Sequence, residues 1–257
     1  KYGCDALRMN MVTSNSPGND MRFYIERCEA MRNFANKLWN ASRYVMMNLA
    51  EDAKNELPDL ANLEIADKWV LSKLNTLIGE VTENMDKWQT DSIVRFFGND
   101  KVMIAGKPAD QVFAGMSEAD SVKTGFFYKQ LAAPDNTTEF KKDTVVYINY
   151  TGKLLNGLVF DTNIERVAKD NNLYSSSKTY EPMQINWGEK YEDLTMTSSK
   201  SSMISGFALT LWQMKAMEKG VGVFYSDLGY GNSGSGSSIP GYAPLIFEIE
   251  LVAKPKK

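Results

Sequence analysis

The 257-residue sequence contains no histidine, which excludes histidine-based catalytic triads and metal sites with histidine ligands. Cys4 and Cys28 are its only cysteines. Two cysteines are too few for a disulfide framework or a four-cysteine zinc site, so we expect both to be unpaired. The net charge of −3 shows no basic excess, and we therefore expect no nucleic acid partner on electrostatic grounds, although a basic face could still occur within a balanced total.

Long apolar runs are also missing. No stretch of about 18 apolar residues occurs, so we expect no membrane span. The sequence shows no signal peptide, but it starts at Lys1, so we expect it to begin inside a longer gene product, and a removed leader stays an open alternative. Its 43% hydrophobic and 24% charged residues are typical of a soluble globular protein, and the compartment stays open between cytoplasm and cell envelope.

The first part of the chain has the apolar periodicity of two helices. Apolar side chains recur at a spacing of three to four residues within 20–56 and again within 63–85. Asp20 can cap the first helix, Pro58 interrupts the pattern, and Asp59 can cap the second helix. This pattern predicts an antiparallel helical hairpin. The hairpin could be an arm that binds a partner or a second copy of the chain, or simply two helices packed on each other.

We predict that this helical arm spans residues 1–98. After it, the pattern of apolar residues is no longer helical. Residues 99–124 are broken by glycines and a proline, and we expect them to be a connecting segment. Residues 125–257 carry short alternating strands separated by Gly, Asn, Ser and Pro clusters. Asn156-Gly157 is a strong signal for a hairpin turn, and a single short helix is expected at 207–219. Many antiparallel strands with one helix indicate an α+β domain.

Four blocks of sequence stand in order across the last 130 residues or so. They are VVYINYTGKL with NGLVFDT at 145–162, MISGF at 203–207 followed by Met214-Lys215 and Gly220, SDLGYG at 226–231, and Ile239-Pro240 with LIFEIEL at 245–251. Together these blocks resemble the FK506-binding type of peptidyl-prolyl cis/trans isomerase over about 123–252. The resemblance implies an antiparallel sheet wrapped around one short helix, with an apolar pocket between them that takes up a proline ring.

The resemblance also implies the residues of that pocket. Asp161 is similar to the family's one charged pocket residue, Tyr230 is the candidate donor to a substrate carbonyl, and Tyr150 would hold Asp161 by a hydrogen bond. The implied substrate-binding side chains are those of Phe160, Met183, Met203, Ile204, Phe207, Ile239 and Phe247. Without the resemblance, the aromatic residues among them would be core residues by default, and Asp161 and Tyr230 could belong to ordinary turns.

The chemistry of such a pocket is compatible with this composition. Rotating an X-Pro bond breaks no covalent bond and requires no nucleophile, metal or organic cofactor, only a dry cavity that prefers the twisted amide. The implied partners are proline-containing peptides or unfolded proteins, and the family's macrolide inhibitors. Polar insertions at 164–180 and 189–202 depart from the family pattern and flank the pocket. The alternatives are a peptide-binding chaperone without catalysis, or an RNA-binding fragment in which the isomerase fold is only a passenger.

The other end of the chain carries a second pattern. Motifs such as RNFANKLWNASR at 32–43 and ADKWVLSKL at 66–74 resemble valyl-tRNA synthetase, where its catalytic core meets the anticodon-binding helices. The resemblance covers residues 1–89 and lacks the nucleotide-binding motifs of the enzyme, so this segment cannot aminoacylate tRNA. The residues Asn36, Lys37, Trp39, Asn40 and Arg43 could contact RNA, although packing and capping within the helices is the interpretation we favour.

Overall fold

The computed structural model describes residues 3–13, 24–49, 60–134 and 139–255. The chain forms two compact units, Lys1–Trp69 and Val70–Lys257, and the division falls within a long helix. The limits at 98 and 124 that the sequence texture suggests stay a prediction. Within the described ranges, every helix is too short or too polar to cross a membrane.

The first unit is helical. Helix α1 (Cys4–Thr13) packs against α2 (Ile25–Met47), and their contact buries Ala6, Asn10 and Cys28. Both cysteines are free thiols. A short 3-10 helix, η1 (Leu60–Asn62), precedes α3 (Ile65–Phe97), which continues into the second unit. The two helices predicted from the apolar spacing are confirmed as α2 and α3, whereas Asp20, Pro58 and Asp59 lie outside the described residues.

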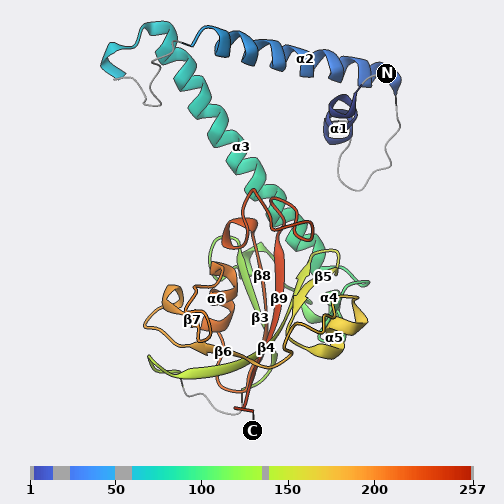
Figure 1. The fold of residues 1–257 in the computed structure, drawn as a ribbon, viewed down its shortest axis with the longest axis vertical. Helices are drawn as coiled ribbons and strands as arrows, with labels where there is room; N and C mark the ends of the chain where they lie inside the picture. Colours follow the sequence, from blue (N-terminus) through green and yellow to red (C-terminus); the bar gives the residue numbers. More distant parts are fainter. Residues whose placement is uncertain (1–2, 14–23, 50–59, 135–138, 256–257) are drawn as a thin grey trace. The chain divides into compact units, whose positions relative to one another are not determined.

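The second unit is built on a seven-stranded antiparallel sheet (Figure 1). Its order is β3-β8-β9-β4-β6-β7, and β5 pairs with the end of β4 beyond β6. The strands are β3 (Phe126–Ala132), β4 (Val145–Leu154), β5 (Val159–Thr162), β6 (Met183–Asn186), β7 (Thr195–Met196), β8 (Lys219–Phe224) and β9 (Leu245–Val252). The α+β class and the antiparallel sheet expected from the sequence are therefore confirmed.

The predicted hairpin joins β4 to β5. The Leu154 N–H donates to the Leu158 carbonyl oxygen at 2.9 Å, and Gly157 N–H donates to the Leu154 carbonyl oxygen at the same distance. Gly157 has φ +87°, a left-handed conformation that glycine adopts without steric cost. This turn brings β5 back along β4, so that Asp161 pairs with Gly152.

The central helix is shorter than the sequence predicted. Helix α6 (Ser205–Trp212) ends seven residues before Lys219, where the expected helix would have ended. Residues 213–218 form a turn in which Met217 has the left-handed φ of 61°, and they lead into β8 at Lys219, which pairs with both β3 and β9. The structure also contains α5 (Glu165–Asp170), a short helix that the sequence analysis did not predict within the insertion at 164–180.

Helix α6 lies very close to β8, and two glycines permit this approach. A Cβ on Gly206 would lie 2.3 Å from the Phe224 ring, and one on Gly222 would lie 1.9 Å from the Thr210 hydroxyl oxygen. Both positions therefore exclude any larger side chain. The face of the sheet that α6 covers forms one hydrophobic core, which includes Phe207, Phe224 and Phe247.

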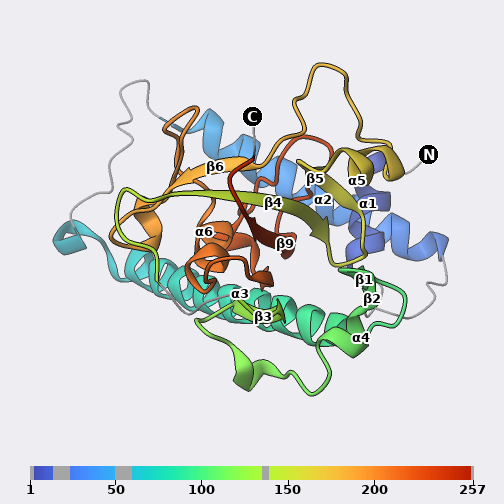
Figure 2. The same cartoon turned by 90° about the horizontal axis from the view of Figure 1, so that it is seen from below.

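A second hydrophobic core covers the opposite face of the same sheet. Phe126 belongs to the first core and its neighbour Phe127 to the second, as strand alternation requires. The end of α3 supplies Ile93 and Phe97 to this second core, and Phe113 joins them from the segment that was expected only to connect the domains. That segment holds β1 (Met103–Ile104), β2 (Lys107–Pro108), α4 (Ala109–Val112) and η2 (Glu118–Asp120), and β1, β2 and α4 lie beside the end of α3 (Figure 2).

Candidate active site

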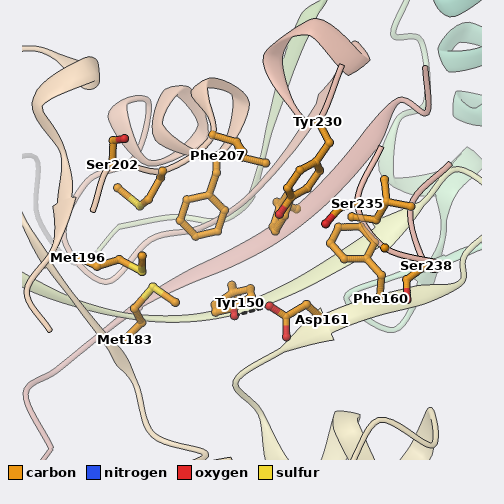
Figure 3. A pocket seen from close by; sticks show the side chains of 15 residues that line it. Tyr150, Phe160, Asp161, Met183, Met196, Ser202, Phe207, Tyr230, Ser235 and Ser238 are labelled. Carbon is orange, nitrogen blue, oxygen red and sulfur yellow. Dashed lines mark hydrogen bonds between the residues drawn. The ribbon is translucent and has the colours of Figure 1, made fainter. Parts of the chain in front are cut away.

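A cavity of about 530 Å³ opens between α6, the sheet and the loops that follow β8. Strands β4, β5, β6 and β9 contribute to its wall, as do α6 and the residues just before it (Figure 3). The lining includes all ten residues that the sequence resemblance placed in a pocket, namely Tyr150, Phe160, Asp161, Met183, Met203, Ile204, Phe207, Tyr230, Ile239 and Phe247. The structure thus brings the whole predicted set together, while their individual roles stay predictions.

Aromatic rings form the base of this cavity. The Phe207 ring meets the Tyr150 ring edge to face at a centroid distance of 5.6 Å and the Phe247 ring at 5.0 Å. Phe160 contacts Phe247 in the same manner at 5.5 Å. Edge-to-face pairs at these distances stabilise one another, so the base is a rigid apolar surface.

The Asp161 carboxylate is the charged group at the edge of this surface. Its Oδ2 accepts a hydrogen bond from the Tyr150 hydroxyl at 2.7 Å, which is the interaction that the resemblance implied (Figure 3). Its Oδ1 accepts a hydrogen bond from the Thr162 N–H at 2.9 Å and forms an ion pair with the Lys178 ammonium at 2.5 Å. Three donors therefore fix the carboxylate in one orientation.

The two pocket tyrosines remain protonated well above neutral pH. Burial, and then the negative charge of Asp161, raise the pKa of Tyr150 far above its usual value of 10. The same two causes, in the same order, raise the pKa of Tyr230. The Tyr230 side chain is 38% exposed, and its hydroxyl makes no hydrogen bond to any described residue, so it is available as a donor to a bound molecule.

The sequence analysis missed part of the lining. Met196 and Ser202 come from the insertion at 189–202. Lys178, which pairs with Asp161 without lining the cavity, comes from the insertion at 164–180 and was missed as well. No motif marks these positions, because the insertions lie outside the blocks that carry the resemblance. Ser235, Gly236 and Ser238 also line the cavity, and the only signal for them was their place beside Ile239 in a glycine-serine loop.

Metal binding finds no support in the described part of the chain, where no three His, Cys, Asp or Glu side chains gather at a position that could hold an ion. The polar groups of the cavity are one carboxylate, several hydroxyls and backbone amides. Such a set can orient the carbonyl groups of a peptide, but it does not resemble a nucleophile and base arranged for bond cleavage.

Different parts of the chain are similar to different known proteins. Residues 136–252 match the family model described as FKBP-type peptidyl-prolyl cis-trans isomerase. Another part of the chain is 57% identical over 89 residues to a valine–tRNA ligase of Clostridium tetani, and 56% identical over 89 residues to that of Clostridium perfringens. These 89 residues are 35% of this chain and 10% of each ligase, so the chain spans about a tenth of the curated relatives it matches.

A structural comparison gives a more distant likeness. A peptidyl-prolyl cis-trans isomerase from Pseudomonas syringae superposes with a TM-score of 0.39 and 22% sequence identity, over 67% of this chain and 94% of that protein. The likeness to isomerases depends instead on the family model, whose residues hold the entire cavity lining described above. The part of the chain at 136–252 is therefore similar to FKBP-type peptidyl-prolyl cis-trans isomerases.

Proposed function

We propose that the chain isomerises X-Pro bonds in peptides or unfolded proteins, and that it does so by binding the twisted amide in the cavity above Phe207. The observation that carries this proposal is the joint position in one hollow of an aromatic base, a fixed Asp161 carboxylate and a Tyr230 hydroxyl that has no hydrogen-bond partner among the described residues. Each of these groups suits a proline-containing peptide: the rings suit the pyrrolidine, and the polar groups suit its carbonyls.

The barrier to be lowered is the loss of amide resonance, which is about 20 kcal/mol. A planar amide is charge-separated, with negative charge on oxygen and positive charge on nitrogen, and twisting the bond removes that separation. A cavity lined by aromatic and aliphatic side chains therefore favours the twisted amide more than water does. In this mechanism the proline ring rests against Phe207 and Phe247, and no proton or covalent bond is exchanged.

The polar groups give the twisted amide its orientation. The Tyr230 hydroxyl donates a hydrogen bond to a substrate carbonyl, and Tyr150 with Lys178 holds Asp161 at the rim. Met183 and Met196 close the side opposite Tyr230 and Phe160, and their flexible side chains would accept different residues beside the proline (Figure 3). We expect this pocket to also accept macrolide inhibitors of the family.

A protease-coupled assay on a prolyl tetrapeptide tests the proposal directly. The wild-type chain should accelerate cis-to-trans conversion, and Phe160→Ala and Asp161→Ala should each lower kcat/KM with little change in the melting temperature. A chain that binds unfolded protein but leaves the isomerisation rate unchanged would instead be a peptide-binding chaperone. That outcome would end the proposal of catalysis.

A further inference from the structure

A hydrogen bond connects helix α3 to the segment that carries Tyr230. The Gln89 side chain, on α3, is 2% exposed, and its Oε1 accepts a hydrogen bond from the Ser226 backbone N–H at 2.7 Å. Ser226 begins the 3-10 helix η4 (Ser226–Leu228) and is itself buried. Both partners lie in the second compact unit, but Gln89 lies outside the residues that match the isomerase family.

The carbonyl group of Ser226 continues this connection toward the pocket. Its oxygen accepts hydrogen bonds from the Gly229 N–H and the Gly231 N–H, each at 2.8 Å. These two glycines stand immediately before and after Tyr230 in the chain. The backbone on either side of Tyr230 is therefore attached to one peptide group, and the residue that supplies this group is held by Gln89.

The Tyr230 hydroxyl depends on this backbone attachment. The side chain is partly exposed and its hydroxyl makes no hydrogen bond to a described residue, so the hydroxyl position follows from where the backbone lies. Glycine neighbours leave that backbone with unusual conformational freedom unless other contacts restrict it. A donor must lie within about 0.5 Å of its productive position to be effective, and a misplacement of about 1 Å can cost two orders of magnitude in rate.

We propose that Gln89 is a positioning residue for Tyr230, so that α3 forms part of the isomerase site although it precedes the matched domain. The proposal rests on the isomerase function proposed above. It gives the end of α3 a role beyond its contribution of Ile93 and Phe97 to the second core. Because Gln89 does not line the cavity, it would act only through the backbone of Ser226, whose N–H it binds and whose carbonyl oxygen holds Gly229 and Gly231.

A double-mutant cycle tests this coupling on the full chain. Gln89→Met keeps the length of the side chain but removes the acceptor, and Tyr230→Phe removes the hydroxyl that is to be positioned. We expect Gln89→Met to lower kcat/KM for a prolyl tetrapeptide about three- to tenfold in the wild-type background and less than about twofold in the Tyr230→Phe background. Equal losses in both backgrounds would overturn the proposal.

The matched control is Ile93→Val, one helical turn further along α3. Ile93 is fully buried in the second core and its side chain has no hydrogen-bonding group, so this change should lower the melting temperature without changing kcat/KM. If Ile93→Val and Gln89→Met lowered kcat/KM in the same proportion to their loss of melting temperature, general destabilisation would explain both, and the proposal would be wrong.

A measurement that does not use activity separates this inference from the proposed function. Amide hydrogen exchange of Gly229 and Gly231, followed by NMR, should be faster in Gln89→Met than in the wild type and unchanged in Ile93→Val. Unchanged exchange in Gln89→Met would overturn the positioning role even if the enzyme is active. An inactive wild-type chain with faster exchange in Gln89→Met would overturn the proposed function and, with it, the catalytic role of Gln89.

Discussion

The two compact units make different use of their apolar side chains. In the second unit the sheet is covered on both faces, and the large rings of Phe126, Phe127 and Phe224 are completely or almost completely buried. In the first unit, α2 leaves Trp39 70% and Tyr44 71% exposed. Apolar content alone therefore does not show where a core forms. It forms where the chain supplies a second layer.

The comparison with known proteins gives this difference a context. The core on the α6 side of the sheet lies almost entirely within the matched residues 136–252, whereas most of the second core lies before them. The valine–tRNA ligase match covers a tenth of those proteins. The apolar spacing of α2 is typical of a face that packs against a partner, and the described residues of this chain leave side chains such as Trp39 on it exposed. We propose that such a face on α2 could pair with a second copy of the chain.

Replacing one aromatic residue in each unit should give the largest difference between the units in the free energy of unfolding. Phe97 is 4% exposed and packs against Phe113 and Phe127, so Phe97→Ala should lower the free energy of unfolding by about 3–5 kcal/mol. Trp39→Ala in α2 should change it by less than about 0.5 kcal/mol. Urea unfolding followed by circular dichroism measures both values, and a large loss in Trp39→Ala would show that the exposed face of α2 has a partner in solution.

A second contrast lies between carboxylates inside and outside the cavity. Asp161→Asn removes the charge that accepts hydrogen bonds from Tyr150 and Thr162 and pairs with Lys178, and we expect kcat/KM to fall about 10- to 100-fold. Asp170→Asn changes an exposed carboxylate at the end of α5 and should leave kcat/KM unchanged. If both variants kept wild-type activity in the tetrapeptide assay, the proposed role of Asp161 would be wrong.

We expect kcat/KM of the isomerase reaction to change little with pH around neutrality, because the chain has no histidine. Burial and Asp161 raise the pKa of both Tyr150 and Tyr230 above 10, so their protonated forms are favoured below that value and are lost only as the pH rises through the raised pKa. We expect kcat/KM to vary by less than about twofold between pH 6 and pH 9, outside the range of both tyrosines. A decrease centred below pH 9 would show that a different group controls activity.

The smallest expected effect concerns RNA. We expect no retardation of a valine tRNA on a native gel, since the net charge is −3 and the matched segment is a small part of a ligase. A retardation that weakens as salt is added would favour RNA contacts from exposed residues of α2 such as Lys37 and Arg43. In that case Lys37→Glu should abolish the retardation without affecting isomerase activity.

Much of the isomerase fold could be predicted because its signals are local. Alternation in β4 and β9 and the Asn156-Gly157 turn reflect strand geometry that a sequence displays directly. The ten predicted pocket residues could be named only through the resemblance, since Phe207 or Phe247 taken alone reads as an ordinary core residue. Their convergence is a product of the whole topology.

Other features have no local signal. Helix α6 was predicted too long because helical spacing continues past Trp212 into residues 213–218, which form a turn before β8. Lys178 reaches Asp161 from a polar insertion whose path depends on its own loop contacts. Gln89 appears in the sequence as one more polar residue of a long helix, and its importance depends on the Ser226 backbone N–H, which lies 137 positions away.

Gly206 in α6 and Gly222 in β8 set how closely the helix approaches the strand, and thereby the depth of the cavity. Helix α6 packs closely on β8 because neither glycine carries a Cβ: one on Gly206 would clash with Phe224, and one on Gly222 would clash with Thr210. Phe207 follows Gly206 directly in the chain. A methyl group at either place would raise the helix and carry the Phe207 ring toward the mouth, which leaves less height for the pyrrolidine of a substrate. We therefore propose that the height of this cavity depends on the hydrogen atoms in place of side chains at Gly206 and Gly222, two residues that do not line the cavity.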